Sequence, residues 1–401
     1  MKSLKRINNE AIKELLTRGV TEVVDHKHLE SALKSGKKLR IKLGIDPTGP
    51  KIHLGNAVIL RKLRDFQRLG HKAVLIVGDF TALIGDPSDK LAKRPMLTVA
   101  QIKTNLKDYK IQLGKILDLK KTEFHFNSKW LAKLKFAEIA ELAETFTVQQ
   151  MLARRNFKDR IESGTEISLR ELLYPLMQGY DSVAIRADVE IGGFDQLFNV
   201  LAGRTVQRAY SQPVQDILTC EMLDGTDGRK MSKSWGNVVN ITEAPNEMFG
   251  KLMSLRDELI LKYLLLCTDV KKSYIDKIDA EIKNGKMNPR DAKLMLAEEI
   301  VKIYYGNKIA IAARKNFIST FSKKEEPIEV ASLKASGKIN AVDLIVNSGV
   351  VKSKSEARRL VDQGAFRVND KVIKNPTNPL NLQGGELIKI GKKSFFRINN
   401  S

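Results

Sequence analysis

Two short motifs, far apart in the chain, carry residue types that can bind and activate a polyphosphate. The first runs from Gly44 to Asn56 and includes His-Leu-Gly-Asn; the second is Lys-Met-Ser-Lys-Ser at 230–234, after the glycine-containing segment 224–228. Glycines let a backbone turn tightly and approach a phosphate, and lysine ammonium groups on a loop can follow a departing pyrophosphate. Neither motif is specific alone, because a histidine at a helix start is about as often a plain polar cap and a Lys-Ser loop is usually only solvated.

The first motif joins a predicted strand to a predicted helix. Residues 39–45 keep the apolar alternation of a strand, and Ile59, Leu63 and Phe66 mark one stripe of an amphipathic helix. The apolar run 73–77 is typical of a buried parallel strand. In such a βαβ unit the helix N-terminus offers unpaired N–H groups at the edge of the sheet where ligands bind. The spacing is neither the dinucleotide fingerprint Gly-x-Gly-x-x-Gly nor a Walker A motif.

Further loops are expected at the same edge of the sheet. Gly, Asp, Pro and Ser gather at 78–88, and the basic residues Lys90 and Arg94 that follow are compatible with phosphate binding or with simple solvation. The pair Gly192-Gly193 ends a predicted strand and precedes a helix from about Asp195. The remaining predictions for this region are a mostly helical segment at 1–37, helix at 97–119, a short strand at 124–126 and an ordered segment at 238–241.

The patterns divide the chain into several parts. Residues 1–243 are expected to form a Rossmann-like α/β catalytic domain with a parallel sheet, interrupted by a helical insertion at about 128–165. This insertion is equally compatible with a dimer surface, a lid or a packed helix pair. The rest is predicted as a separate helical domain at 244–321 in which Asn288-Pro289 starts a helix, a linker at 322–337 and a small α+β module at 338–401.

Composition limits the classes of protein that the chain can belong to. Lys and Arg number 69 against 47 Asp and Glu, which gives a formal net charge of +22 over 401 residues. This excess favours a polyanionic partner such as nucleic acid, although a generally Lys-rich composition would produce part of it. Two cysteines are too few for a disulfide framework or a zinc site. With no signal-peptide core and no apolar stretch of bilayer length, we expect a cytoplasmic protein without a membrane segment.

The C-terminal module is the most basic part of the chain. Residues 338–401 contain twelve Lys and Arg against five Asp and Glu. Ser353 and Glu356 have the spacing of a capping box that opens a helix bearing Arg358 and Arg359. The segment 366–372 is predicted to be a hairpin with a polar turn. A helix and a turn that both present Arg and Lys favour a clamp on an RNA backbone.

Together these motifs resemble those of the bacterial tyrosyl-tRNA synthetases, which are class I aminoacyl-tRNA synthetases. The two class I signatures correspond to 53–56 and 230–234; the narrower motifs are Gly-Ile-Asp-Pro-Thr at 44–48, Gly-Asp-Pro-Ser at 85–88, Tyr-x-x-x-Gln-x-x-Asp at 174–181 and Gly-Gly-Phe-Asp-Gln at 192–196. Residues 339 to about 390 resemble the S4 RNA-binding module that ends those enzymes. The resemblance spans nearly the whole chain, and it implies that the helical domain at 244–321 binds the anticodon.

The resemblance implies a two-step reaction. The tyrosine carboxylate attacks the α-phosphate of ATP, which carries Mg²⁺ as a substrate complex, to give tyrosyl-adenylate and pyrophosphate. The tyrosyl group then passes to the 3′ end of tRNA(Tyr). No protein nucleophile and no protein-bound metal are needed, so positioning and charge stabilisation would supply the catalysis. The family resemblance also implies a homodimer formed through the helical insertion.

The same resemblance assigns expected roles residue by residue. The residues expected to act in catalysis, on the ATP phosphates and the leaving pyrophosphate, are His53, Asn56, Thr48, Lys230 and Lys233. Those expected to contact ATP elsewhere, with Asp195 on the ribose, are Gly44, Asp46, Gly55, Lys90, Arg94, Gly193, Asp195, Met231 and Ser232. Those expected to bind tyrosine, with Asp181 accepting the phenol hydrogen bond, are Asp86, Tyr174, Gln178, Asp181 and Gln196. Those expected to bind RNA are Lys354, Arg358, Arg359 and Arg367.

Three departures from the family pattern and two rival hypotheses accompany these expectations. Lys42 stands where the best-known members have a second tyrosine for the phenol, Asn56 stands for the last His of the first signature, and Asp89 stands for a Gly. The first rival is the sister enzyme for tryptophan, whose motifs also suit 47–56. The second is a non-catalytic RNA-binding protein. The spacing of Tyr174, Gln178 and Asp181 places them on one helix face. The alternative interpretation of this face is an ordinary solvent-exposed helix surface. If the face is buried, however, burying its Gln and Asp without ligands would cost free energy.

Overall fold

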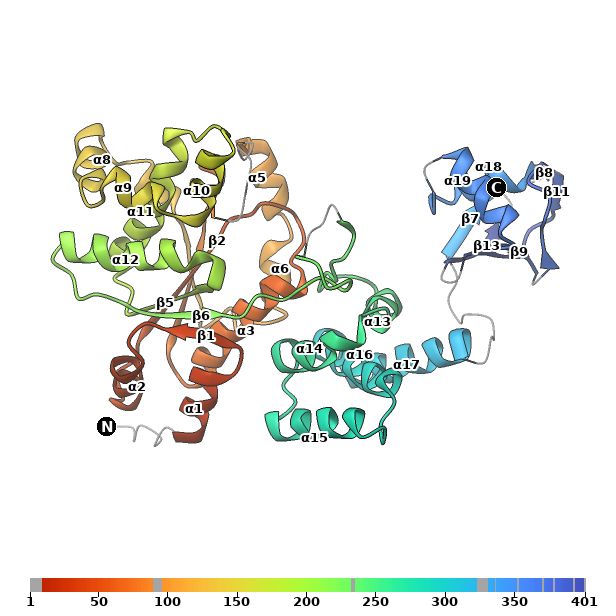
Figure 1. Cartoon of the computed structure of the whole chain (residues 1–401), viewed down its shortest axis with the longest axis horizontal. Coiled ribbons are helices and arrows are strands. Elements are labelled where there is room, and N and C mark those ends of the chain that lie inside the picture. The colour runs from red at the N-terminus through yellow and green to blue at the C-terminus, as the bar shows by residue number, and fades with distance from the viewer. Residues whose placement is uncertain are drawn as a thin grey trace. The chain divides into compact units, whose positions relative to one another are not determined.

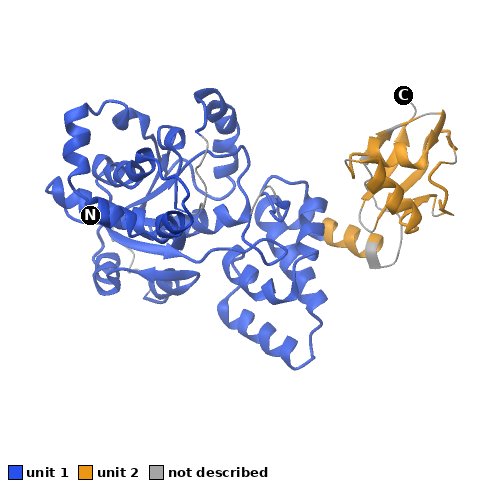
Figure 2. Cartoon of the chain, turned by 45° about the horizontal axis from the view of Figure 1, so that its top comes forward, with its two compact units in different colours: residues 1–311 blue, residues 312–401 orange. Residues whose placement is uncertain are grey.

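The computed structural model describes residues 9–88, 96–231, 235–322 and 331–399, apart from 336, 352, 370, 378, 392 and 393. The chain consists of two compact units, residues 1–311 and 312–401 (Figure 2). Within the described ranges, none of the helices is long and apolar enough to cross a bilayer.

The first unit is built on a six-stranded sheet with the order β1-β6-β5-β2-β3-β4. The strands are β1 (Val20–Val23), β2 (Arg40–Ile45), β3 (Lys72–Val77), β4 (Glu123–Phe126), β5 (Val189–Gly193) and β6 (Asp216–Cys220). All neighbouring pairs are parallel except the edge strand β1, which runs antiparallel to β6. The predicted parallel α/β architecture is therefore confirmed. Among the described residues of 1–37, helices at 9–17 and 26–34 agree with the predicted, mostly helical segment. The strand β1 between them was not predicted, because its four residues carry little local pattern and are ordered by pairing with β6.

Helices cover both faces of this sheet. Figure 1 shows α11 and α12 on one side and α1 and α3 on the other. The helices up to the insertion are α1 (Asn9–Thr17), α2 (His26–Lys34), α3 (Leu54–Arg68), α4 (Thr81–Ile84), α5 (Val99–Leu106) and α6 (Tyr109–Leu113). The insertion contains α7 (Ser128–Leu131), α8 (Phe136–Ala143), α9 (Val148–Leu152) and α10 (Arg155–Glu162), and it is followed by α11 (Leu169–Ile185), the 3-10 turn η1 (Phe194–Gln196) and α12 (Leu197–Ala209).

Helices also form the C-terminal part of the first unit, from residue 245 onward. They are α13 (Pro245–Met253), η3 (Asp257–Leu259), α14 (Ile260–Cys267), α15 (Lys272–Lys283), α16 (Pro289–Tyr305) and the start of α17 (Asn307–Ser322). Asn288 caps α16 as predicted, because its side chain accepts a hydrogen bond from the Arg290 N–H. Asp269, just after α14, forms ion pairs with Arg61, Arg64 and Arg68 of α3. These contacts fasten the helical region to the helix that carries the first motif.

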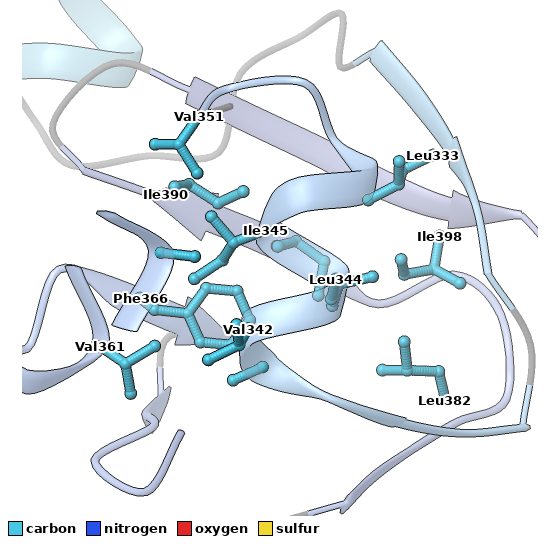
Figure 3. Close-up of a cluster of buried hydrophobic side chains, with 13 residues drawn as sticks. Leu333, Val342, Leu344, Ile345, Val351, Val361, Phe366, Leu382, Ile390 and Ile398 are labelled. Carbon is cyan, nitrogen blue, oxygen red and sulfur yellow. The ribbon is translucent and has the colours of Figure 1, made fainter. Parts of the chain in front are cut away.

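The second unit has its own sheets and its own core. A five-stranded sheet has the order β10-β9-β12-β13-β7, and β11 pairs with β8. Its elements are β7 (Ala331–Lys334), β8 (Gly337–Asn340), α18 (Ala341–Asn347), α19 (Lys354–Asp362), β9 (Phe366–Val368), β10 (Lys371–Val372), β11 (Pro379–Leu382), β12 (Leu387–Ile390) and β13 (Ser394–Asn399). Leu344, Ile345 and Phe366 lie at the centre of the buried cluster drawn in Figure 3.

The elements of the module agree with the sequence in two places and differ in one. Ser353 caps α19 by accepting from the Glu356 N–H, and β9 pairs with β10 as the predicted hairpin. The predicted linker 322–337, by contrast, contains β7, which pairs in parallel with β13. The module therefore begins by residue 331, and the polar, Ser-containing sequence of this segment concealed a strand that a distant partner orders.

Candidate active site

A cleft of about 590 Å³ opens at the carboxyl ends of β2, β3 and β5. Its lining brings together most of the residues that the sequence had singled out at separate places: Gly44, Asp46, Thr48, His53, Gly55, Asn56, Asp86, Tyr174, Gln178, Asp181, Gly193, Asp195, Gln196, Lys230 and Met231. Four further expected residues, Lys90, Arg94, Ser232 and Lys233, lie outside the described residues.

The N-terminus of α3 forms one wall of the cleft. His53 is its N-cap, in extended conformation, and exchanges two long hydrogen bonds of 3.4 Å with Asn56, one from each backbone N–H to the other side chain. A Cβ on Gly55 would lie 3.1 Å from both the His53 ring and Met231 Sδ. The His-Leu-Gly-Asn motif thus serves as a polar cap and still faces the cleft, where the helix dipole favours an anion.

The segment 238–241 holds this helix start in place. Leu54 N–H donates to the Val239 carbonyl at 2.9 Å, and the Ile241 N–H donates to the Ile52 carbonyl at 3.0 Å. The second motif is tied to the same segment by Asn237, whose Nδ2 donates to Asp227 at 2.8 Å and to the Lys230 carbonyl at 3.1 Å. Both motifs are therefore attached to one short stretch of chain.

The end of β5 forms the opposite wall of the cleft. A Cβ on Gly193 would lie 2.6 Å from Asp195 Oδ1 and 3.0 Å from Met222 Sδ, so only glycine lets the Asp195 side chain fold back here. Asp195 itself is exposed on the 3-10 turn η1. A carboxylate in this position can accept hydrogen bonds from the hydroxyls of a ribose.

The inner end of the cleft contains a buried carboxylate, Asp181 of α11, which is 3% exposed. It accepts hydrogen bonds from Trp130 Nε1 at 2.7 Å and Asn127 Nδ2 at 3.2 Å. Burial raises the pKa of Asp181 to about 6, against the opposing effect of Lys42 and of its two donors. Such a group can accept a hydrogen bond from a phenol that reaches the inner end of the cleft.

Asp46 links the inner end of the cleft to the phosphate side. Its Oδ2 accepts from Tyr174 OH at 2.9 Å and its Oδ1 accepts from Thr81 Oγ1 at 2.7 Å. Burial, together with Asp46 and Asp86, raises the pKa of Tyr174 well above its usual value, so this phenol stays neutral and donates. Asp46 was expected to contact ATP, and in the structure it accepts hydrogen bonds from Tyr174 and Thr81.

Asp86 is fixed by donors from three sides. It accepts from Gln196 Nε2 at 2.7 Å and from the backbone N–H and hydroxyl of Ser88 at 2.9 and 2.6 Å. Asn199 Nδ2 adds a longer bond of 3.3 Å. The insertion reaches this loop through Arg154, which donates to Ser88 Oγ at 2.9 Å. An anion held in this way is suited to bind an ammonium group.

Several residues of the site were not found from the sequence. Asn127 and Trp130 follow β4 and carry no motif, although an Asn just after a strand is a weak signal for the ligand edge. Arg154 carries no motif either. Lys42, the residue at the departure from the family pattern, is fully buried and forms an ion pair of 2.9 Å with Glu190. Alternating strand patterns do not reveal a buried Lys-Glu pair, because both residues look like solvent-facing positions.

Comparison with known proteins places this arrangement in a family. Residues 34–322 match the family model described as tRNA synthetases class I (W and Y), and residues 342–382 match the S4 domain. The tyrosine–tRNA ligase of Thermotoga maritima is 46% identical over 387 residues, which cover 96% of each chain. That of Carboxydothermus hydrogenoformans is also 46% identical, over 398 residues covering 96% of this chain and 97% of the relative.

Solved structures show the same fold at lower identity. A C-terminally truncated mitochondrial tyrosyl-tRNA synthetase of Aspergillus nidulans matches with a TM-score of 0.61 and 23% identity, over 79% of this chain and 93% of that one. At this identity the likeness concerns the fold only. The family assignment comes from the relatives that match over 96% of the chain and from the family model. The chain belongs to the tyrosine–tRNA ligases, a family of class I aminoacyl-tRNA synthetases.

Proposed function

We propose that the protein joins L-tyrosine to tRNA(Tyr) in two steps at the cleft of the first unit. The observation that carries the proposal is the position of a buried acceptor, Asp181, at the inner end of a cleft whose mouth is the N-terminus of α3. One end suits a phenol and the other a polyphosphate. Between them, Asp86 and Gln178 offer oxygens to an ammonium group.

In the first step, the tyrosine carboxylate attacks the α-phosphorus of ATP in line. A carboxylate–phosphorus bond forms, the bond to the bridging oxygen of pyrophosphate breaks, and the pyrophosphate leaves with the electron pair. The N–H groups of the α3 N-terminus and the side chains of His53 and Asn56 stabilise the charge that builds on the phosphates. Lys230 and Lys233 neutralise the leaving pyrophosphate. Losing one well-placed donor of this kind typically costs about 10²- to 10³-fold in rate.

In the second step, the terminal ribose hydroxyl of the tRNA attacks the carbonyl carbon of tyrosyl-adenylate. The ester bond forms, AMP leaves with the electron pair, and the hydroxyl proton passes to the departing phosphate or to water. Mg²⁺ enters with ATP as part of the substrate. Among the described residues, no group of three or more His, Cys, Asp and Glu is arranged to hold a metal ion of its own.

The partners follow from the charge and the surface of the chain. The S4 module would hold RNA through Lys354, Arg358, Arg359 and Arg367, all of which are exposed. The helical insertion would form the contact of a homodimer, and the reaction would take place in the cytoplasm.

Exchange of labelled pyrophosphate into ATP tests this proposal directly. Tyrosine should support the exchange, and tryptophan and phenylalanine should not. Exchange driven by tryptophan would favour the sister enzyme. Absence of exchange with every amino acid would favour a non-catalytic RNA-binding protein and contradict the proposal.

A further inference from the structure

Lys42 and Glu190 form a fully buried ion pair directly behind the tyrosine end of the cleft. They lie opposite each other in the parallel pairing of β2 and β5, and both are 0% exposed. The three hydrogens of the Lys42 ammonium have three acceptors: the Gln178 backbone carbonyl at 2.7 Å, Ser182 Oγ at 2.7 Å and Glu190 Oε1 at 2.9 Å. The ammonium is therefore completely satisfied by protein and locked to one turn of α11.

Glu190 completes the same network from the acceptor side. Its Oε1 accepts from Gln178 Nε2 at 3.0 Å, and its Oε2 accepts from Ser182 Oγ at 3.1 Å and from Gln215 Nε2 at 2.5 Å. A carboxylate only accepts hydrogen bonds, so the NH₂ of the Gln178 amide must face Glu190. Gln178 lines the cleft. Its Oε1 is consequently the atom that it can offer to a donor such as the ammonium of an amino acid.

Stability alone is a poor explanation for this pair. Taking two charges out of water costs free energy that their attraction only partly returns, and apolar residues of similar volume often replace such pairs without loss. The pair is more easily understood from what surrounds it. The backbone carbonyl of Gln178 accepts a hydrogen bond from Lys42, and its side-chain amide donates one to Glu190, so the residue is held at two points. Asp181 follows three residues later on the same helix.

We propose that Lys42 and Glu190 are a positioning pair for the substrate amino acid: Glu190 sets the orientation of the Gln178 amide toward the ammonium, and Lys42 is the positive charge that keeps Asp181 a hydrogen-bond acceptor for the phenol. This inference rests on the proposed function. It assigns to Lys42 a role that differs from that of the tyrosine found at this position in the best-known relatives.

The charges around Asp181 have opposite effects on its ionisation. Lys42 of β2 favours the carboxylate, as do the N–H donors of Trp130 and Asn127, whereas Glu190 of β5 disfavours it. Asp46 at the end of β2, Asp86 in the 85–88 loop and the neutral Tyr174 of α11 also face this part of the cleft. Removing Lys42 and removing Glu190 should therefore move the titration of Asp181 in opposite directions.

Three variants of the full-length protein test the pair: K42M, E190Q and K42M/E190Q. Pyrophosphate exchange is measured across pH 5–8 with tyrosine or ATP varied. We expect E190Q and the double variant to raise KM for tyrosine about 10-fold or more, with KM for ATP and kcat nearly unchanged. The acid limb of kcat/KM for tyrosine should move to higher pH in K42M and to lower pH in E190Q. The double variant leaves no lone buried charge, so it should fold even if K42M does not.

A second buried ion pair provides the control. Arg160 and Glu171 are also 0% exposed and 2.8 Å apart, but neither lines the cleft. The matched variant R160M/E171Q should leave KM for tyrosine and the acid limb unchanged. Folded E190Q and K42M/E190Q enzymes that keep the KM and acid limb of the unchanged protein would overturn the inference while leaving the proposed function intact. If the unchanged protein shows no tyrosine-dependent exchange, the proposed function fails and this inference fails with it.

Discussion

Asp181 is a carboxylate that the fold has removed almost entirely from water. Its two N–H donors, Trp130 and Asn127, leave lone pairs that a ligand hydroxyl can still use. When the ligand lacks that hydroxyl, a buried acceptor loses a partner, and the penalty falls on binding of the wrong amino acid. If the protein binds tyrosine as proposed, we therefore expect this one group to discriminate against phenylalanine.

Replacing Asp181 by asparagine should weaken this discrimination. A hydrogen bond to a charged group contributes about 1.5–3 kcal/mol, so kcat/KM for tyrosine should fall about 10- to 100-fold while that for phenylalanine changes little. Pyrophosphate exchange with each amino acid gives both values. An unchanged ratio of the two would show that Asp181 does not contact the phenol.

The raised pKa of Asp181 predicts a particular pH dependence. Below pH 6 the carboxylate takes up a proton and ceases to be a pure acceptor, so kcat/KM for tyrosine should fall about tenfold per pH unit there. The stability effect has the opposite sign. The pKa of Asp181 is about 6 in the folded protein, above its ordinary value of 3.8. Between these two pH values the folded state binds more protons than the unfolded state, so the protein gains stability as the pH falls through this window. Both effects should disappear in D181N, as measured by exchange and by thermal unfolding at pH 4.5 and 7.

Besides Trp130, which donates to Asp181, the insertion brings a buried guanidinium to the proposed tyrosine site. Arg154, at the start of α10, lies 5.1 Å from the centre of the Phe157 ring and 4.7 Å from that of Phe198, and it donates to Ser88 Oγ. Ser88 in turn donates to Asp86. Packing on two aromatic rings holds the guanidinium rigidly. A segment that interrupts the α/β fold thereby helps to fix the group expected to bind the tyrosine ammonium.

This chain of contacts predicts the result of removing Arg154. R154M should raise KM for tyrosine about 10-fold and leave KM for ATP unchanged, because the Ser88–Asp86 loop loses its outer hydrogen bond. The neighbouring Arg155 is exposed, so R155M is the matched control and should behave like the unchanged protein. Equal effects of the two substitutions would mean that only the general charge of the insertion matters.

The elements that the sequence predicted well are those with strong local periodicity. β2, α3, β3 and β5 each have an apolar pattern of their own, and the glycines that follow them mark the ligand edge. β1, β6 and β7 were missed or assigned to other structure, since short strands are ordered mainly by their partners. For the same reason, the network of Lys42 and Glu190 depends on which residues β2 and β5 bring face to face, and a single sequence does not contain that information.

The insertion and the start of α11 have exposed apolar side chains that a monomer would leave in water. Phe136, Val148, Ile161 and Leu169 are 88%, 61%, 53% and 80% exposed, and they come from α8, α9, α10 and the start of α11. Exposed large apolar residues within one region are typical of an interaction surface. They support the homodimer proposed above.

Sedimentation analysis should therefore find a dimer. F136E/L169E should shift it to a monomer by raising the dimer dissociation constant at least about 100-fold, since each substitution buries a charge at the contact. Circular dichroism should show the same helix content for both proteins. A monomeric unchanged protein, or a variant that remains dimeric, would contradict dimerisation through the insertion.

The S4 module has a complete core of its own, from Leu333 on β7 to Ile398 on β13, which indicates that it folds independently of the catalytic unit. Deleting residues 323–401 removes it while keeping α17 whole. Tyrosine-dependent pyrophosphate exchange should then stay within about threefold of the unchanged protein, whereas charging of tRNA should fall by about 10-fold or more at physiological salt, because the phosphate contacts of the module are lost.

A charge variant separates the loss of basic groups from the loss of the module. Arg358, Arg359 and Arg367 are exposed on α19 and β9, so R358A/R359A/R367A should keep the core of Figure 3 intact. If each arginine meets a phosphate, the slope of log affinity for tRNA against log salt should decrease by about one per residue removed. Nitrocellulose filter binding between 50 and 300 mM KCl measures this slope, with pyrophosphate exchange as the internal control. The deletion could impair charging while the triple variant keeps the full salt slope. In that case the RNA contact lies on other surfaces of the module and not at these three arginines.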